Sequence, residues 1–322
     1  MKINRQLIGF KNSFTLESGK ILSGFELMVD TYGELNSDAS NAILVCHAFS
    51  GNHHAAGKHE TDATEGWWDQ MIGPGKAIDT NKYFIVCPNN LGGCAGSTGP
   101  TSINPASKEP YGGDFPVVSV SDWVNSQKLL MEHLGINKWE IVIGGSLGGM
   151  QALEWSLSYP HLVNKAGVIA AAAKASTQNI GMNEVAREAI RKDENFHDGN
   201  YLAMRTKPKR GLKTARMLGH ITYLSEEHMN LRFGRKVQNE DTKIDGYVDF
   251  EIENYLKYKG EKFSDSFDAN SYILMTKAMD GYDPASKKNG NLTKAMEPIK
   301  AKLLIVGFET DWLFPAKRGK EI

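Results

Sequence analysis

The sequence predicts an α/β fold built on a mostly parallel sheet with helices on both faces. Short, continuously apolar runs recur through the first half of the chain, as expected of strands that are covered on both sides. Stretches with helical periodicity alternate with these runs, which is the pattern of parallel β–α–β units. After residue 175 the sequence becomes charged and mostly helical, and the strand pattern returns only at Lys302–Gly307.

This change in composition divides the chain into two predicted units. Residues 1–175 and 295–322 form the sheet-containing core, and residues 176–294 are inserted between its strands as a helical lid. A chain of 322 residues is long enough to bury one large core with a smaller unit added to it.

Each element follows from a local pattern. Residues 1–40 form a leading β region, in which a loosely alternating strand spans Leu22–Thr31. Continuous apolar runs predict further strands at Ala42–Cys46, Tyr83–Cys87, Ile141–Ile143, Gly167–Ala171 and Lys302–Gly307. Apolar spacing near the helical repeat predicts helices at Val118–Leu134, Met150–Leu157, Asn183–Lys192, Gly211–Leu224 and Asn270–Met279.

The composition argues against several classes of function. The chain has 37 basic and 38 acidic residues and a net charge of −1, so neither a nucleic acid nor a membrane surface is an expected partner. The N-terminal residues lack the apolar core of a signal peptide, and no apolar run is long enough to span a membrane. Cys46, Cys87 and Cys94 form no C-x-x-C spacing, which predicts free thiols and a cytoplasmic protein.

The segment Gly144–Gly149 is the motif that points most directly to chemistry. It reads Gly-Gly-Ser-Leu-Gly-Gly, matches G-x-S-x-G, and lies between a predicted strand and a predicted helix. Such a turn strains the backbone of its serine, and glycines leave room for the neighbouring strand and helix. We therefore predict that Ser146 is a nucleophile. The other interpretations are a serine that only caps the helix and a dinucleotide-binding loop, although the spacing is not G-x-G-x-x-G.

A serine nucleophile needs a base, and the base needs an acid that orients it. In proteins with this elbow the acid follows the serine in the chain, after a later strand, and the histidine follows the acid. Asp311 has this position, and Glu309 is a competing acid. The simpler interpretation of Asp311 is that it is an ordinary turn residue. The expected histidine is missing from the chain, because His228 is its last histidine.

The turn after the strand Ala42–Cys46 is predicted to supply half of an oxyanion hole. The predicted donors are the backbone N–H groups of Phe49 and Leu147. Four histidines crowd the same turn and raise the question of a metal site, namely His47, His53, His54 and His59. No carboxylate or cysteine completes a recognisable ligand spacing, so we predict no metal and assign His47 to the turn.

Longer segments resemble the homoserine O-acyltransferases of methionine biosynthesis, a family with the α/β-hydrolase fold. The segment Asn89–Pro100, which begins Asn-Asn-Leu-Gly-Gly, is far more specific than the elbow. The other segments that carry the resemblance are Cys46–Gly51, Gly144–Gln151, Ala215–Tyr223 and Asp311–Pro315. The resemblance covers nearly the whole chain.

The resemblance implies a ping-pong acyl transfer that needs no cofactor. Ser146 attacks the thioester of an acyl-CoA, CoA leaves, and the hydroxyl of L-homoserine takes the acyl group. Arg216 matches the family's arginine that holds the homoserine carboxylate, and a guanidinium binds a carboxylate bidentately. Without the family, a solvated charge on a helix is the simpler interpretation of Arg216. The resemblance also implies a homodimer, with the helical insertion at the interface.

The chain departs from the family pattern in two places. The family continues through a Gly-His-Asp segment that holds the catalytic base, so we expect the sequence to be a fragment, with an inactive protein as the alternative. Family members that use succinyl-CoA tend to carry an arginine directly after an Asp-Trp pair, where this chain has Leu313. Because an uncharged side chain does not offset the desolvation of a second carboxylate, Leu313 predicts acetyl-CoA as the acyl donor.

The leading hypothesis is therefore a homoserine O-acetyltransferase in which Ser146 carries the acetyl group. The alternatives within the family are a homoserine O-succinyltransferase and a serine O-acyltransferase, since homoserine is only one methylene longer than serine. An ester or thioester hydrolase would use the same elbow with water as the acceptor. The hypothesis from another class is a catalytically inactive protein that binds a partner, and the missing histidine is its support.

Overall fold

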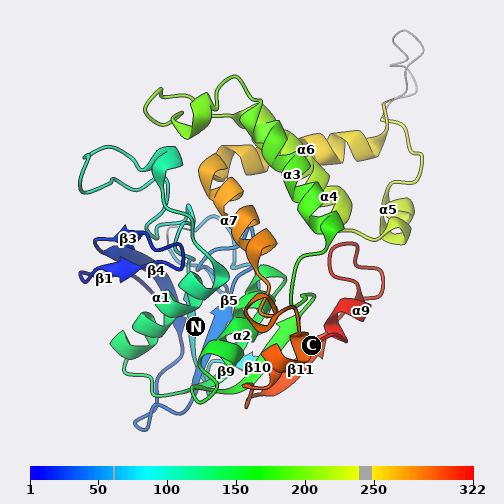
Figure 1. The fold of residues 1–322 in the computed structure, drawn as a ribbon. Coiled ribbons are helices and arrows are strands. Elements are labelled where there is room, and N and C mark those ends of the chain that lie inside the picture. Colours follow the sequence, from blue (N-terminus) through cyan, green and yellow to red (C-terminus); the bar gives the residue numbers. More distant parts are fainter. Residues whose placement is uncertain (61, 239–248) are drawn as a thin grey trace.

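The computed structural model describes residues 1–60, 62–238 and 249–322. Its centre is a seven-stranded sheet with the order β1-β4-β8-β5-β9-β10-β11 (Figure 1). The strands of this sheet are β1 (Ile3–Phe10), β4 (Phe25–Tyr32), β5 (Ala42–Cys46), β8 (Phe84–Pro88), β9 (Trp139–Gly145), β10 (Val163–Ile169) and β11 (Lys302–Val306). The two pairs that include β4 are antiparallel, and every other neighbouring pair is parallel. The mostly parallel sheet that the sequence predicts is therefore present.

The remaining elements connect these strands. Two short pairs lie outside the main sheet, β2 (Phe14–Thr15) with β3 (Ile21–Leu22) and β6 (Ile72–Gly73) with β7 (Ile78–Asp79). The helices are α1 (Val120–His133), α2 (Leu147–Ser158), α3 (Thr177–Arg191), α4 (Lys209–Thr222), α5 (Glu226–Arg232), α6 (Glu251–Ser266), α7 (Ala269–Gly281), α8 (Leu292–Met296) and α9 (Ala316–Gly319). Short 3₁₀ turns lie at Gly112–Asp114, His197–Gly199 and Ser286–Lys288.

The start of α1 is fixed by a capping box. The Ser119 hydroxyl accepts from the N–H of Asp122, and the Asp122 carboxylate accepts from the N–H of Ser119 over 2.8 Å. The same carboxylate accepts from the N–H of Glu17 over 2.8 Å, so the N-terminal region is tied to this helix. These bonds satisfy donors that a helix start otherwise leaves unpaired, which explains why the helix begins at Val120.

The two faces of the sheet are covered differently. Side chains of α1 and α2, including Trp123 and Trp155, form one large buried cluster with the sheet. On the opposite face the segment 55–78 packs against Val45 and Ile85. In its described residues this segment contains β6 and β7 and no helix. The sequence predicts helices on both faces, whereas here small and apolar side chains of this segment cover the second face directly.

The segment between β10 and β11 is helical in its described residues, as its charged and periodic sequence predicts. α4 packs against α3 and α6, and α3 also contacts α7. Figure 1 shows these four helices grouped above the strands β5 and β9 in this view. The sequence pattern predicts α3, α4 and α7 but not α5 or α6.

A buried arginine joins two of these helices. Arg187 of α3 is 1% exposed, and its guanidinium lies 2.7 Å from the carboxylate of Asp280, next to the end of α7. The guanidinium also lies 2.7 Å from the Glu184 carboxylate, and Asn183 donates to Asp280 over 2.7 Å. Such a pair is costly to break, because the charge that remains keeps its desolvation penalty.

We expect Arg187→Met to lower the free energy of unfolding by about 3–5 kcal/mol, because it leaves the Asp280 carboxylate without its cation. The matched control is Arg191→Met, which removes a partly exposed arginine of the same helix and changes stability by less than about 1 kcal/mol. Urea unfolding followed by circular dichroism measures both variants. Equal losses would show that the buried pair does not hold α3 against α7.

Candidate active site

Ser146 joins the end of β9 to the start of α2. Its backbone has φ 54° and ψ −121°, a region that residues with side chains rarely occupy. The Ser146 N–H donates to the carbonyl of Ile169 at the end of β10 over 2.8 Å. The Ser146 carbonyl accepts from the N–H of Gly149 over 2.9 Å. The strained strand-to-helix turn that the motif predicts is therefore present.

The glycines around Ser146 are required because β5 passes directly against the turn. A Cβ atom on Gly148 would lie 2.1 Å from the carbonyl oxygen of Cys46, and one on Gly144 would lie 2.5 Å from the same oxygen. These separations are far below any ordinary packing contact, so a side chain at either position forces the backbone apart. The last residue of β5 is thus held against the first turn of α2.

The predicted oxyanion donors lie on the two sides of this contact. Leu147 is the first residue of α2, and Phe49 lies in the turn that follows β5. Within the described residues, neither backbone N–H has an intramolecular acceptor. The Phe49 side chain is 8% exposed and packs edge-on against the Tyr272 ring at a centroid distance of 4.8 Å. Both N–H groups are therefore available to a bound oxygen.

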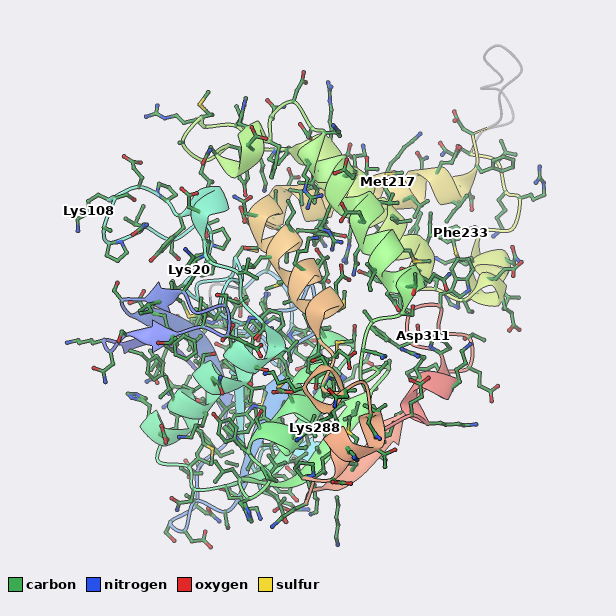
Figure 2. The ribbon with its side chains drawn as sticks, in the orientation of Figure 1. Lys20, Lys108, Met217, Phe233, Lys288 and Asp311 are labelled. Carbon is green, nitrogen blue, oxygen red and sulfur yellow. The ribbon has the colours of Figure 1, made fainter. Side chains whose placement is uncertain are left out.

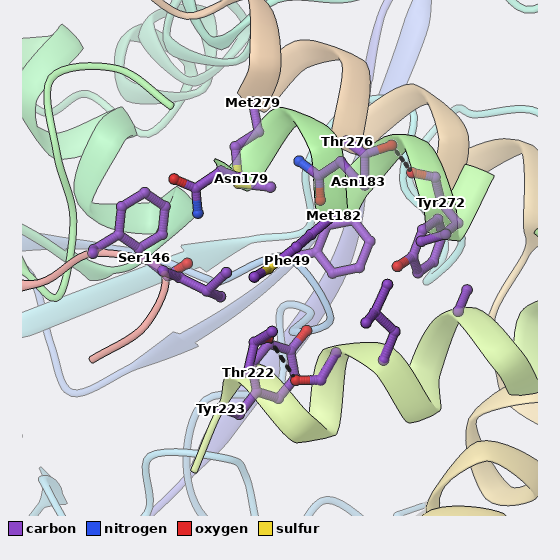
Figure 3. Close-up of a pocket in the computed structure, with 16 residues that line it drawn as sticks. Phe49, Ser146, Asn179, Met182, Asn183, Thr222, Tyr223, Tyr272, Thr276 and Met279 are labelled. Carbon is purple, nitrogen blue, oxygen red and sulfur yellow. Dashed lines mark hydrogen bonds between the residues drawn. The ribbon is translucent and has the colours of Figure 1, made fainter. Parts of the chain in front are cut away.

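Ser146 lies where two cavities meet. The inner cavity has a volume of about 60 Å³ and lies among α3, α4 and α7 (Figure 3). The outer cavity has a volume of about 530 Å³ and is bounded by the turn after β5 and by the loop that contains Phe308 and Asp311. Phe49 and Leu313 line both cavities together with Ser146. Two different groups can therefore approach this serine from different directions.

The inner cavity combines apolar walls with a few polar groups. Figure 3 shows Asn179 and Asn183 on its lining, together with Met182 and Met279. The Asn183 amide is held by its hydrogen bond to Asp280, and the Asn179 amide belongs to the capping box of α3. The sequence analysis did not identify this lining, because helical periodicity does not reveal which helices share a cavity.

Asp311 lies in the loop after β11, on the side of the molecule that Figure 2 shows facing the helical segment. Its carboxylate accepts hydrogen bonds from the N–H groups of Leu313 and Phe314, over 2.8 and 2.9 Å. Asp311 lines the outer cavity with Ser146. The competing acid, Glu309, is exposed and does not line that cavity. The position of Asp311 is therefore the better one for an acid that acts near Ser146.

Arg216 of α4 is held by aromatic rings and not by carboxylates. Its guanidinium lies 4.6 Å from the ring centroid of Phe263 and 5.4 Å from that of Tyr223. It donates to the hydroxyl of Ser50 over 3.1 Å, and its buried Nε has no acceptor. Within the described residues it forms no ion pair. This partly buried cation therefore has no counter-charge among the described residues.

The structure brings no histidine into hydrogen-bonding contact with Ser146 or Asp311 within its described residues. His228 lines the outer cavity, and His47 is completely buried behind the turn after β5. Burial disfavours the charged ring of His47 and lowers its pKa to about 4. In the described part of the chain no group of His, Cys, Asp or Glu side chains is placed to hold a metal. No described helix is long and apolar enough to cross a membrane.

The fold and the turn at Ser146 define a class of protein. Residues 41–322 match the family described as alpha/beta hydrolase fold. The sheet order and the strained serine between β9 and α2 agree with this match. The prediction of an α/β-hydrolase fold is therefore confirmed.

Comparison with individual proteins narrows the class. The chain is 56% identical over 323 residues to the homoserine O-succinyltransferase of Hahella chejuensis, and the match covers 99% of this chain and 84% of that protein. A crystal structure of homoserine O-acetyltransferase from Bacillus anthracis has a TM-score of 0.91 at 31% identity, over 100% of this chain and 87% of that one. Esterase E22 has a TM-score of 0.89 at 34% identity, over 99% of this chain and 88% of that one. The chain belongs to the homoserine O-acyltransferase family, a family of acyltransferases, as the resemblance implies.

We expect Gly148→Ala to destabilise the fold by more than about 2 kcal/mol, because the new Cβ meets the carbonyl of Cys46 and overpacks the turn. Gly145→Ala is the matched control, since its Cβ would meet only the Ile169 carbonyl oxygen, at 3.8 Å. Thermal unfolding of the two variants gives the comparison. If both variants have the same unfolding temperature, the Cys46 carbonyl of β5 does not exclude a side chain at position 148.

The pH dependence of stability provides a further prediction. The folded pKa of His47 lies below its usual value of 6.5, so the unfolded chain binds this proton first as the pH falls. Stability is therefore lost between about pH 6.5 and pH 4, with a slope of about 1.4 kcal/mol per pH unit from this ring. His47→Gln should show a correspondingly shallower slope in urea unfolding over that range. An unchanged slope would contradict a neutral, buried His47.

Proposed function

We propose that this chain is a homoserine O-acyltransferase that transfers an acyl group through Ser146. The observation that carries the proposal is the position of Ser146 at the junction of two cavities. Arg216, which has no carboxylate partner among the described residues, donates to Ser50 in the lining of the outer cavity. A two-substrate transfer needs access for a donor and for an acceptor. The names of the Hahella and Bacillus relatives support homoserine as the acceptor.

Each step assigns a role to a side chain or backbone group described above. The Ser146 Oγ attacks the thioester carbonyl, and the N–H groups of Leu147 and Phe49 donate to the oxyanion that forms. CoA then leaves as the thiol, and the homoserine hydroxyl attacks the acyl-serine ester to regenerate Ser146. Asp311 orients the base that takes the serine proton, and the family resemblance assigns that base to the histidine of a Gly-His-Asp segment. Arg216 holds the carboxylate of homoserine.

The helices α3 to α8 act as a lid in this proposal. Residues of α3, α4 and α7 enclose the inner cavity beside Ser146 and limit the access of water. Exclusion of water favours transfer to an amino-acid hydroxyl over hydrolysis. The likeness to esterase E22 makes hydrolysis the natural competing reaction for this arrangement.

We propose succinyl-CoA as the acyl donor, although Leu313 predicts acetyl-CoA. The Hahella relative, which is similar over 99% of this chain, is named for succinyl transfer, and this similarity involves far more residues than one position. Acetyl-CoA is the second candidate for a specific reason. Leu313 lines both cavities, and no lysine or arginine is among the described residues that line either cavity. The second carboxylate of a succinyl group would therefore find no positively charged side chain in the lining of either cavity, which favours acetyl-CoA.

The donor is tested by measuring kcat/KM with succinyl-CoA and with acetyl-CoA, using L-homoserine and L-serine as acceptors. We expect O-succinylhomoserine by mass spectrometry and a preference for succinyl-CoA of about tenfold or more, which is about 1.4 kcal/mol. Leu313→Arg should raise this preference, and the uncharged, volume-conserving Leu313→Met should leave it unchanged. A preference for acetyl-CoA would reverse the choice of donor. Equal CoA release with and without homoserine would identify a hydrolase.

A further inference from the structure

The carbonyl of Ala48, in the turn after β5, is held by two donors. The His47 ring nitrogen Nδ1 lies 2.8 Å from this oxygen, and the N–H of Gly51 donates to it over 2.9 Å. The other ring nitrogen of His47, Nε2, accepts from the N–H of Asn90 over 3.0 Å. His47 therefore links the turn after β5 to the loop after β8, and no step of the proposed reaction uses it.

These contacts determine the protonation of the His47 ring. A neutral imidazole has one donor and one acceptor nitrogen. The N–H of Asn90 can only donate, so Nε2 is the acceptor and the proton must be on Nδ1. The Nδ1–H group then donates to the Ala48 carbonyl, which can only accept. The ring is completely buried, which keeps it neutral and excludes water from both contacts.

The Ala48 carbonyl and the Phe49 N–H belong to one peptide group. In a trans peptide these two groups point in opposite directions, so fixing the carbonyl also fixes the N–H. A rotated peptide would direct the Ala48 carbonyl to the side where the Phe49 N–H now lies. It would also break both hydrogen bonds to that oxygen. The orientation of the Phe49 N–H, which has no acceptor within the described residues, thus depends on the donors behind it.

A chain of buried polar side chains holds the preceding carbonyl. The Gln151 amide of α2 lies 3.5 Å from the carbonyl oxygen of His47. Gln127 of α1 donates to Gln151 over 2.7 Å, and the indole N–H of Trp155 donates to Gln127 over 2.7 Å. All three side chains are at most 2% exposed. The turn after β5 is therefore held on two sides, by a hydrogen-bonded chain and by the His47 ring.

We propose that His47 is a positioning residue that sets the oxyanion hole through the Ala48–Phe49 peptide. As the Nδ1–H tautomer it draws the Ala48 carbonyl away from Ser146 and keeps the Phe49 N–H directed at the site where the oxyanion forms. The inference shares one assumption with the proposed function, which is that the Phe49 N–H donates to the oxyanion. It also gives a role to part of the Asn-Asn-Leu-Gly-Gly segment, because the N–H of Asn90 selects the tautomer of His47.

Two substitutions separate the two contacts of the ring. In His47→Asn the amide N–H takes the place of Nδ1–H and retains the donor to Ala48. In His47→Gln the amide oxygen takes the place of Nε2, so the contact with Asn90 is retained and the donor to Ala48 is lost. The rate of Ser146 acylation by p-nitrophenyl acetate is the readout, because it requires neither CoA nor homoserine. The test therefore remains valid even if the protein does not transfer an acyl group to homoserine.

We expect His47→Gln to lower the acylation rate constant by about tenfold or more, toward the loss seen when an oxyanion donor is removed, with little change in KM. His47→Asn should stay within about threefold of the wild type, since the peptide remains oriented. His53→Asn, which replaces a neighbouring buried histidine with no hydrogen bond to Ala48, is the control and should acylate like the wild type. Equal losses in the two His47 variants would overturn the proposal.

A measurement on the unmodified protein completes the test. Long-range ¹H–¹⁵N correlation spectra identify which ring nitrogen of His47 carries the proton. We expect Nδ1–H and an unprotonated Nε2 at neutral pH. A proton on Nε2 overturns the proposal, and this result does not depend on whether the variants fold. If the wild type shows no acylation while Nδ1 carries the proton, that result counts against the proposed function and not against the role of His47.

Discussion

The structure depends on the close contact between the end of β5 and the start of α2. Gly144 and Gly148 have no side chain, so the carbonyl of Cys46 approaches the turn at Ser146 directly. This contact brings the turn after β5, with Phe49, next to the helix start at Leu147. Phe49 and Ser146, from distant parts of the sequence, thereby line the same cavities. Any side chain at either glycine separates them.

The strain at Ser146 is maintained by the packing around it. A residue with a side chain at such a backbone conformation costs about 1–3 kcal/mol. α2 is buried along most of its length, and Trp155 packs edge-on against Trp139 of β9 at a centroid distance of 6.1 Å. Burial of one such large side chain contributes about 1.5–3 kcal/mol, which offsets the strain. The burial of α2 along most of its length therefore has a function beyond core formation, because it fixes the serine.

The sequence predicts the central sheet and the turn at Ser146 because both depend on local patterns. Buried strands such as β5 and β8 are short apolar runs, and the G-x-S-x-G motif needs only a strand before it and a helix after it. The inner cavity was not predictable, since Asn179 and Met279 lie on helices that meet only in the folded chain. The role proposed for His47 was not predictable either, because it depends on hydrogen bonds that span 43 residues. The family resemblance named the donor from Leu313 alone, and the more extensive similarity to a succinyltransferase favours the alternative.

Two arginines of the helical segment have contrasting partners, and this contrast supports the role proposed for Arg216. Arg187 is surrounded by carboxylates of Asp280 and Glu184, so its charge is neutralised within the fold. Arg216 contacts the faces of Phe263 and Tyr223, which attract a cation without neutralising its charge. A ring face also keeps water from the guanidinium, and in the proposed function this would strengthen its interaction with the homoserine carboxylate. Both residues are arginines on predicted helices, and only the folded structure reveals that the charge of Arg187 is paired within the fold, whereas that of Arg216 has no ion-pair partner among the described residues.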